Sequence, residues 1–505
     1  MWTVRRAGAL IALVVVAGGC AALAAEAAAR SKPRATPVAV TVDTAHPGVQ
    51  VPPSFLGFSI EYPDVPIYAG TPQRPNRPFA RLLGSLGGYG NGPAVLRIGG
   101  NSTDQSWWNP AHAPRPANVF NDLDPAWVSS LATLVAAVRT PVILGVNLGL
   151  NDAANALAFA GAVGQALPAH TLQSLEVGNE PDLYTRPKSF RVGRRLLRRP
   201  QHRASYDFET YLRELDSYLS ALSPLGHPLL AGGFASVAWD LSTPELLDRE
   251  RRRLAGLSAH SYPLNTCGSK RRNAASLGRR LLGNTQAVRR ITALAAVASA
   301  RGVPLRVTEA NSMTCGGVKG ASDTFASALW AVNVLFGYLN GGAAGVNLHT
   351  WSGAYYAPVD FRAVAGRTAA VVRPLFYGLM LFARATADGA QLLPTVSTRR
   401  QGLTVWATRA RAGVVRVLIV NASGSRTRGA VVRIAGVSGR GSVERLTARS
   451  LRAASGVRLA GRSYGRVSSD GRLRGRRRVE AVTPHRGRYR FLVPPASAAL
   501  LTLQP

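Results

Sequence analysis

Two glutamates have the clearest capacity for chemistry in this sequence, because each stands at the end of a short apolar run. Glu180 ends Leu175–Glu180 within Asn179-Glu180-Pro181, and Glu309 ends Leu305–Glu309. Two facing carboxyls can cleave a glycosidic bond, since one protonates the leaving oxygen while the other attacks the anomeric carbon or activates water. Either glutamate alone would more simply be a surface or ion-paired carboxylate. The inference therefore depends on the pair.

The elements that must position these glutamates form a repeating pattern, in which helix-patterned stretches lie between short apolar runs. The predicted helices include Ala126–Val138, Ala153–Ala166, Phe208–Leu222 and Thr324–Leu339. The predicted strands are Leu56–Tyr62, Ala94–Gly100, Val142–Gly149, Leu175–Glu180, Leu229–Ala235, Leu257–Tyr262, Leu305–Glu309 and Val346–Trp351. Eight such units predict an α/β fold, a closed (β/α)₈ TIM barrel, whose active-site groups lie at the carboxyl ends of its strands.

Beyond about residue 386 the pattern changes to short strands separated by turn residues. These runs are Leu403–Ala407, Val414–Val420, Val431–Ile434, Ser442–Leu446 and Tyr489–Val493. We therefore predict a signal peptide at 1–24, a linker at 25–36, a segment at 37–54 whose strand Val38–Val42 joins the sandwich, the barrel at 55–385 and a C-terminal β-sandwich at 386–505. The Gly/Arg/Ser-rich stretch Gly456–Val479 is interpreted as a solvated loop.

The N-terminus is typical of an exported protein. Met1–Ala24 combines Arg5 and Arg6 with an apolar stretch and ends in Ala22-Leu23-Ala24, which fits a signal-peptidase site. Cys20 follows Ala17-Gly18-Gly19, a loose match to a lipoprotein box, so a lipid anchor remains an alternative to free secretion. No apolar run of 18 residues follows, which predicts a mature chain without a transmembrane segment.

Export also bears on the cysteines. If Cys20 is cleaved off or lipidated, Cys267 and Cys315 remain as an even pair in an oxidising compartment. We expect a disulfide between them. The alternative is two unpaired thiols.

The charge of the chain is strongly positive, with 61 basic against 26 acidic residues and a formal net charge of +35. These basic residues are dispersed, and neither a zinc-finger spacing nor an aromatic-interleaved RNA-binding strand accompanies them, so we expect no nucleic-acid partner. Association with anionic cell-envelope glycans is physically easier to accept. The arginine content also fits a GC-rich genome.

Several further motifs occur in order along the predicted strands. They are Leu56-Gly57-Phe58-Ser59-Ile60-Glu61, Leu96-Arg97-Ile98-Gly99-Gly100-Asn101-Ser102-Thr103-Asp104, Ala259-His260-Ser261-Tyr262-Pro263, Glu309-Ala310-Asn311-Ser312 and Gly316-Gly317 followed by Ser322-Asp323-Thr324-Phe325. With Asn179-Glu180-Pro181, this set resembles glycoside hydrolase family 79, the heparanase and β-glucuronidase family, within the clan of retaining (β/α)₈ glycosidases. The resemblance extends from about Val38 to the end of the chain and is strongest in the barrel.

The resemblance implies Glu180 as the acid/base and Glu309 as the nucleophile. The substrate-binding residues that it implies are Asn179, Glu61, Asn101, Thr103, Tyr262 and Tyr356. Simpler interpretations stay open: Thr103 would cap a turn, Tyr262 would be a core aromatic, and Tyr355 would take the place of Tyr356. Arg97 would orient the nucleophile or pair with a buried carboxylate elsewhere. His260 is interpreted as structural support.

One departure concerns the loop after the nucleophile. Heparanase-like members bind the glucuronate carboxylate there with Tyr-Gly-Gly, whereas this sequence has Thr314-Cys315-Gly316 at the corresponding spacing. The backbone N–H groups of Gly316 and Gly317 remain candidates for binding an anion, with Lys319 adding charge. A disulfide at Cys315 would make this side of the pocket rigid.

Neither a cofactor nor a metal is expected, because the sequence has no His-x-x-x-His, paired Cys-x-x-Cys or phosphate-binding loop. The sequence thus predicts a secreted retaining β-glycosidase that acts on a carbohydrate substrate, a β-glucuronide or a glucuronic-acid-containing glycan. A neutral sugar in the same site is the nearer alternative. A non-catalytic envelope glycan-binding protein is the alternative from another class.

Overall fold

The computed structural model describes residues 37–192, 195–200, 205–268, 273–398 and 403–505. The predicted signal peptide, the linker and Cys20 lie outside these residues. Within the described residues, no helix is both long and apolar enough to cross a membrane.

Eight parallel strands close into a barrel, so the predicted fold class is confirmed. They are β2 (Leu56–Ile60), β3 (Val95–Ile98), β6 (Val142–Val146), β7 (Leu172–Val177), β10 (Leu229–Phe234), β11 (Leu254–Ser261), β12 (Leu305–Ala310) and β13 (Ala343–Thr350). Each contains one of the predicted apolar runs or at least half of it. The barrel closes between the last strand and the first, where Val346 of β13 pairs with Leu56 of β2.

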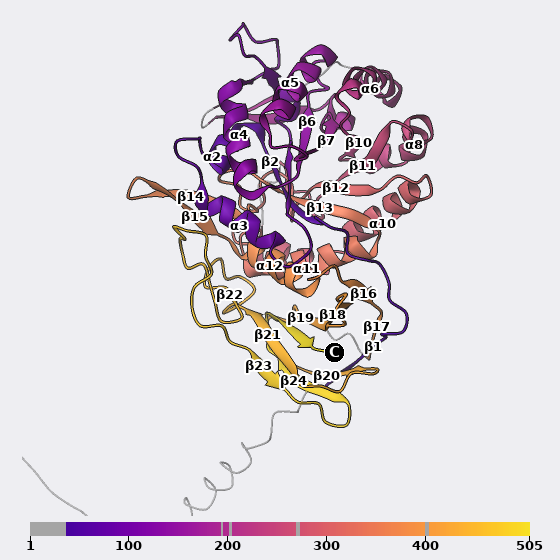
Figure 1. Ribbon diagram of the computed structural model, residues 1–505, viewed down its shortest axis with the longest axis vertical. Helices are drawn as coiled ribbons and strands as arrows, with labels where there is room; N and C mark the ends of the chain where they lie inside the picture. Colours follow the sequence, from indigo (N-terminus) through magenta and orange to yellow (C-terminus); the bar gives the residue numbers. More distant parts are fainter. Residues whose placement is uncertain (1–36, 193–194, 201–204, 269–272, 399–402) are drawn as a thin grey trace, which may run out of the picture.

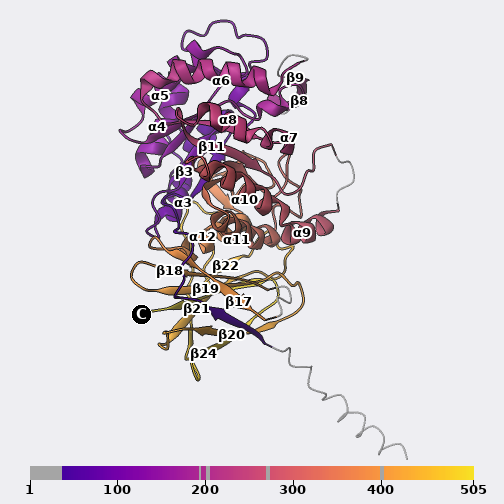
Figure 2. The ribbon, with the colours of Figure 1, turned by 90° about the vertical axis from the view of Figure 1, so that its right-hand side faces the viewer.

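Helices cover the outside of the barrel (Figures 1 and 2). They are α2 (Val65–Ala69), α3 (Arg77–Gly87), α4 (Pro125–Val138), α5 (Ala153–Ala166), α6 (Phe208–Leu222), α7 (Val237–Asp240), α8 (Thr243–Glu250), α9 (Ala274–Gly283), α10 (Gln286–Ser299), α11 (Phe325–Asn340) and α12 (Pro374–Ala385). Three of them begin at an aspartate whose side chain accepts a hydrogen bond from a backbone N–H three residues on, namely Asp124, Asp152 and Asp207. Such caps satisfy an N–H that the helix itself leaves without a partner.

Small elements occupy the loops of the barrel. They are the parallel pair β4 (Ser106–Trp108) and β5 (Asn121–Leu123), the hairpin β8 (Pro187–Val192) and β9 (Arg195–Pro200), the hairpin β14 (Val359–Val364) and β15 (Arg367–Val372), and the 3₁₀ turns η1 (Tyr62–Asp64), η2 (Thr103–Gln105), η3 (Pro181–Leu183) and η4 (Ser223–Leu225). Of these, η2 and η3 follow the barrel strands β3 and β7.

Two sheets stack below the barrel, with α11 and α12 between them and the barrel strands (Figures 1 and 2). One sheet has the order β17 (Thr395–Ser397), β1 (Val38–Val42), β20 (Arg428–Ile434) and β24 (Arg488–Val493). The other has the order β16 (Gln391–Leu393), β18 (Leu403–Arg409), β19 (Val415–Asn421), β25 (Ser497–Leu503), β21 (Gly441–Thr447) and β22 (Arg458–Leu459), with β23 (Glu480–Val482) beside β21. Val38, Val40 and Val42 point into the core between the sheets, as alternation in a strand requires.

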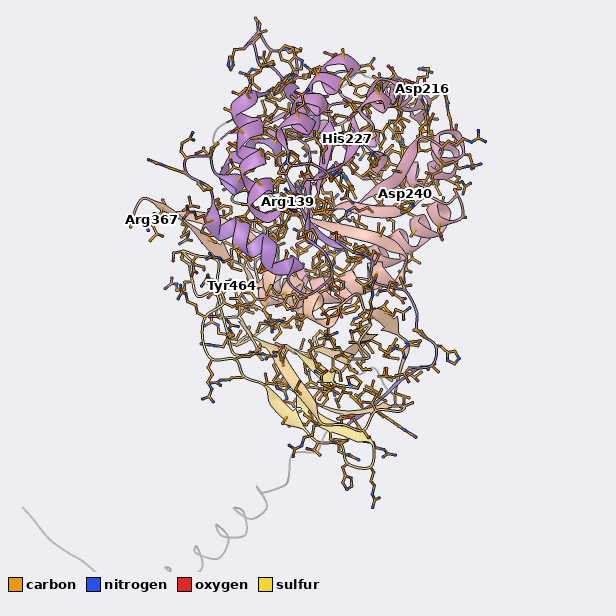
Figure 3. The ribbon with its side chains drawn as sticks, in the orientation of Figure 1. Arg139, Asp216, His227, Asp240, Arg367 and Tyr464 are labelled. Atoms are coloured by element: carbon orange, nitrogen blue, oxygen red, sulfur yellow. A yellow bond between two sulfur atoms is a disulfide. The ribbon has the colours of Figure 1, made fainter. Side chains whose placement is uncertain are left out.

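The structure corrects two details of the sequence interpretation. Gly456–Val479 is not simply a solvated loop, because Tyr464 is buried against the rings of Phe376 and Tyr377 on α12, at the junction of barrel and sandwich (Figure 3). A strand was also overlooked at the end of the chain. β25 lies between β19 and β21, and it follows the turn signal Pro494-Pro495 with only Ala496 between them.

Candidate active site

The two glutamates meet at the carboxyl ends of the barrel strands. Glu309 lies on β12, and Glu180 lies between β7 and η3. One oxygen of each carboxyl and one ring nitrogen of His260 lie within 4.8 Å of one another. The barrel therefore brings together side chains that are 129 residues apart, counted from 180 to 309.

Glu309 is held by a donor on each oxygen. Arg97 Nη1 donates to Oε2 at 2.7 Å, and the Tyr262 hydroxyl donates to Oε1 at 2.7 Å. Burial alone would raise the pKa of this carboxyl, which is 5% exposed, but the nearby charges of His349 and Arg97 and the Tyr262 hydrogen bond hold its pKa far below the usual range. Glu309 is therefore ionised and fixed, as a nucleophile must be.

Arg97 on β3 connects both glutamate-bearing strands. The guanidinium is fully buried, its Nε donates to Glu176 Oε2 at 2.6 Å, and its Nη2 donates to Asn179 Oδ1 at 3.0 Å. Burial would raise the pKa of Glu176, but the Arg97 charge outweighs burial and lowers it. Both interpretations of Arg97 thus apply together: it orients Glu309, and it pairs with a buried carboxylate.

Glu180 faces His260, whose Nδ1 lies 3.1 Å from Glu180 Oε1. The other ring nitrogen of His260 lies 3.4 Å from Arg97 Nη2. Because a guanidinium only donates, Nε2 is the acceptor in this pair, and we assign the donor role to Nδ1, which faces Glu180. This contact occupies Oε1. The described residues give Oε2 no hydrogen bond, so Oε2 is the oxygen that is available for proton exchange.

Glu61 follows β2 and is fixed by the turn after β3. The backbone N–H groups of Asn101 and Ser102 donate to Glu61 Oε1 at 3.2 Å and Oε2 at 2.8 Å. Gly100, at φ +102°, makes this approach possible, because a Cβ there would lie 2.5 Å from Glu61 Oε1. Asn101 thus reaches the site through its backbone.

His349 on β13 lies between two carboxylates of the site. Its Nε2 is 3.3 Å from Glu61 Oε1, and its Nδ1 is 3.7 Å from Glu309 Oε2. Burial would lower the pKa of the imidazole, but the charges of Glu309 and Glu61 outweigh burial and raise it. A positive charge on His349 in turn lowers the pKa of Glu309.

The wall beside the nucleophile is aromatic. The Tyr356 hydroxyl accepts a hydrogen bond from Trp351 Nε1 at 3.0 Å, and its ring centroid lies 6.3 Å from that of Tyr262. Tyr355 is 42% exposed. Of the two tyrosines considered for this position, the structure places Tyr356 against the site.

Thr103 lies differently from the other predicted residues. It belongs to η2 and is buried, and a Cβ on Gly145 of β6 would be 3.1 Å from its side chain. The contact that the structure gives Thr103 is therefore with the barrel wall.

The loop after Glu309 is fixed by the expected disulfide, which links Cys267 to Cys315. Gly317 N–H donates to the Thr314 carbonyl at 3.2 Å, so this group is used inside its own turn. For the N–H of Gly316 the described residues provide no partner. Gly316 lies under Trp351, since a Cβ at this position would be 2.7 Å from the indole. The expected pair of anion-binding N–H groups is thus reduced to one.

Removal of this disulfide should destabilise the chain while leaving the glutamates in place. The bond closes a loop of 48 residues, for which loop-closure entropy gives about 4 kcal/mol. We expect a Cys267→Ser and Cys315→Ser double variant to lose a large part of this stability, measured by denaturant unfolding. Reducing agent should lower the stability of the wild-type chain but not that of the double variant.

Glu180, His260 and Glu309 also have the composition of a possible metal site among the described residues. Their surroundings oppose a divalent cation. Arg97 is hydrogen-bonded to Glu309 and adjoins His260, so a metal ion would meet a fixed positive charge. We therefore assign the cluster to acid/base and nucleophilic chemistry.

Comparison with known proteins gives two β-glucuronidases as relatives. One, from Aspergillus niger, is 25% identical over 73% of this chain and 71% of its own length. The other, from Neurospora crassa, is 24% identical over 68% of this chain and 65% of its own length. No family model matches the chain.

Solved structures share the fold at lower identity. A 4-O-α-L-rhamnosyl-β-D-glucuronidase from Fusarium oxysporum aligns with a TM-score of 0.74 at 19% identity, covering 92% of this chain and 100% of that one. A family 51 arabinofuranosidase from Xanthomonas axonopodis aligns with a TM-score of 0.67 at 16% identity, covering 93% and 100%. These likenesses concern the fold.

Three residues of the site were not identified from the sequence: Glu176, Asp104 and His349. Glu176 and His349 are each the one ionisable residue of a barrel strand that is largely buried. A carboxylate in a buried strand requires a partner of opposite charge. Arg97, the one arginine in β3, could therefore have been predicted to pair with Glu176. Asp104 ends the Leu96–Asp104 motif, and the motif alone does not show which loops its carboxylate joins.

His349 gives a pH prediction with a definite sign. Its positive charge lowers the pKa of Glu309, so His349→Gln should raise that pKa. The nucleophile would then take up a proton at higher pH, and the acid limb of kcat/KM should move to higher pH than in the wild type. His485→Gln on the exposed surface of the sandwich is the matched control and should leave the profile unchanged. An unmoved acid limb in His349→Gln would contradict this electrostatic role.

Proposed function

We propose that this chain is a secreted retaining β-glycosidase that hydrolyses β-glucuronides or glucuronic-acid-containing glycans through a covalent glycosyl-enzyme on Glu309. That it is a glycoside hydrolase follows from its β-glucuronidase relatives together with its barrel. The retaining mechanism is supported by one observation, the approach of Glu180 and Glu309 oxygens to within 4.8 Å. Retaining enzymes keep their carboxyls about 5 to 5.5 Å apart, whereas inverting enzymes leave room for a water at about 6.5 to 9.5 Å.

In the first step Glu309 attacks the anomeric carbon while Glu180 protonates the departing oxygen. Tyr262 and Arg97 keep the attacking carboxylate in line. In the second step Glu180 removes a proton from water, which attacks the anomeric carbon and releases Glu309. Asn179, fixed by Arg97, is the proposed contact for the sugar 2-hydroxyl.

The choice of a glucuronide is supported by the names of the relatives, and membership of family 79 by the ordered motifs. The Gly316 N–H is the proposed contact for the sugar carboxylate. A neutral sugar remains the alternative, because this loop lacks a tyrosine and retains one of the two expected N–H groups.

The test is hydrolysis of 4-nitrophenyl β-glucuronide beside the corresponding glucoside, galactoside and xyloside. We expect turnover of the glucuronide, with the β-anomer of the sugar as first product by NMR. Turnover of a neutral glycoside alone would overturn the uronic-acid specificity and keep the mechanism. An α-anomer as first product would overturn retention, and a chain that binds these glycosides without turnover would be a glycan-binding protein.

We also propose that the exported chain associates with anionic glycans of the cell envelope, through the arginine-rich segment Gly456–Val479. The segment is held in place, since Ser463 and Arg474 form a bridge and Arg474 pairs with Asp470 at 2.9 Å. Arg472, Arg476 and Arg478 are exposed. Their replacement by serine should lower the salt concentration that elutes the protein from immobilised polyuronate, whereas Arg251→Ser with Arg252→Ser should change it less. Elution of both variants at the same salt concentration would contradict the assignment of glycan binding to this segment.

A further inference from the structure

Asp104, the last residue of the Leu96–Asp104 motif that begins on β3, makes a set of contacts that the proposed mechanism does not use. Its side chain is 3% exposed. Oδ1 accepts hydrogen bonds from the backbone N–H groups of Leu148 and Gly149, both at 3.1 Å. Oδ2 accepts from the backbone N–H of Asn179 at 3.1 Å and from the Tyr184 hydroxyl at 2.8 Å. One carboxylate thus joins the loops that follow β3, β6 and β7.

The contacts of Oδ2 enclose Glu180. Asn179 directly precedes it, and Tyr184 directly follows η3, so the same oxygen holds the turn before and after the acid/base. Burial and the charge of Asp104 raise the pKa of the Tyr184 hydroxyl well above its usual value, so this hydroxyl remains a donor. Tyr184 is itself buried.

The turn that is held in this way is strained. Glu180 has φ +50° and ψ +56°, in the left-handed region, which is unfavourable for a residue with a Cβ. Such a conformation persists where the surrounding structure determines it. On the other flank, Asp182 accepts hydrogen bonds from the backbone N–H groups of Ala235 at 3.1 Å and Ser236 at 2.7 Å, which ties the turn to the loop after β10.

We propose that Asp104 is the positioning residue of the acid/base: by holding Asn179 and Tyr184 it keeps the left-handed turn closed and aims the Glu180 carboxyl at the leaving oxygen. This inference rests on the proposed glycosidase function. The nucleophile has separate contacts, from Arg97 and Tyr262. Weakening the hydrogen bonds of Asp104 should therefore slow proton transfer from Glu180 and leave the attack by Glu309 nearly unchanged.

The experiment measures kcat/KM for Asp104→Asn and Tyr184→Phe on aryl β-glycosides of the sugar that the wild type hydrolyses, with leaving groups from good to poor. Tyr184→Phe removes one hydroxyl, and we expect a loss of roughly 10-fold on poor leaving groups, as for one hydrogen bond to a charged group, with little loss on good ones. Asp104→Asn replaces an acceptor by an amide and should show the same pattern more strongly. Tyr377→Phe, which removes a buried hydroxyl at the sandwich junction, is the matched control and should behave as wild type.

The slope of rate against leaving-group pKa separates positioning from general support of the fold. A steeper slope in both variants, with thermal unfolding near that of the wild type for Tyr184→Phe, supports the proposal. Rates that fall equally for all leaving groups would overturn it, since Asp104 would then serve the fold alone. A wild type that hydrolyses none of the glycosides would overturn the proposed function, and the positioning role with it.

Discussion

Glu309→Gln should abolish turnover, with kcat falling roughly 10⁴-fold or more, because the variant lacks the anionic oxygen that forms the covalent bond in the proposed mechanism. The fold should persist. Glutamine has nearly the shape of glutamate, and its carbonyl oxygen can accept from Arg97 as Oε2 does. Its amide group then faces the Tyr262 hydroxyl, which can turn its hydrogen away and accept. The measurement is hydrolysis of an activated aryl glycoside, with the mass of trapped glycosyl-peptide from a 2-fluoro sugar as the direct readout.

Glu250→Gln is the matched control, because Glu250 is also buried and paired with an arginine, Arg253, on the outside of the barrel. Its activity should stay within a few-fold of the wild type. Near-normal turnover in Glu309→Gln, or a trapped sugar on another residue, would refute the assignment of the nucleophile.

Glu180→Ala should divide substrates by their leaving groups. For aglycones that need protonation, the rate of the first step should fall about 10² to 10⁴-fold, which is the usual contribution of a general acid. Activated phenols leave as anions, so their release in the first step should be nearly as fast as in the wild type. The second step would then become slow, because water lacks its base, and a burst of released phenol should precede a low steady rate. Stopped-flow measurement of that burst is the test.

Azide provides the control for this variant, since an anionic nucleophile requires no base. It should accelerate the steady rate of Glu180→Ala with the activated substrate and yield the β-glycosyl azide, while leaving Glu309→Gln inactive. Equal losses for good and poor leaving groups, without rescue by azide, would contradict the acid/base role of Glu180.

The sequence contained enough information for the barrel and its glutamates, for a physical reason. Strands buried on both faces read as apolar runs, and a parallel barrel must bring their carboxyl ends to one mouth. Glu180 and Glu309 each interrupt such a run at its end. Their meeting could therefore be predicted without any knowledge of the distances.

The other residues of the site could not be recognised from the sequence, because their partners lie on strands and loops that meet only when the barrel closes. His349 contacts Glu61 only because β13 pairs with β2, and nothing in the sequence of the strand distinguishes a histidine beside carboxylates from a core histidine. Likewise, Gly317 looked available for an anion, but the backbone turn that occupies its N–H follows from φ values that a glycine pair leaves open.

The position of β1 has a consequence for the order in which the chain can fold. β1 pairs with β17 on one side and β20 on the other, and Val38 lies beside Ala430. The sandwich therefore cannot be completed until nearly the whole polypeptide has emerged, and closing so long a loop makes this a late event. Until then β1 lacks its partner strands β17 and β20. A fragment that begins at residue 386 would lack an interior strand and expose two open sheet edges, which are sites for aggregation.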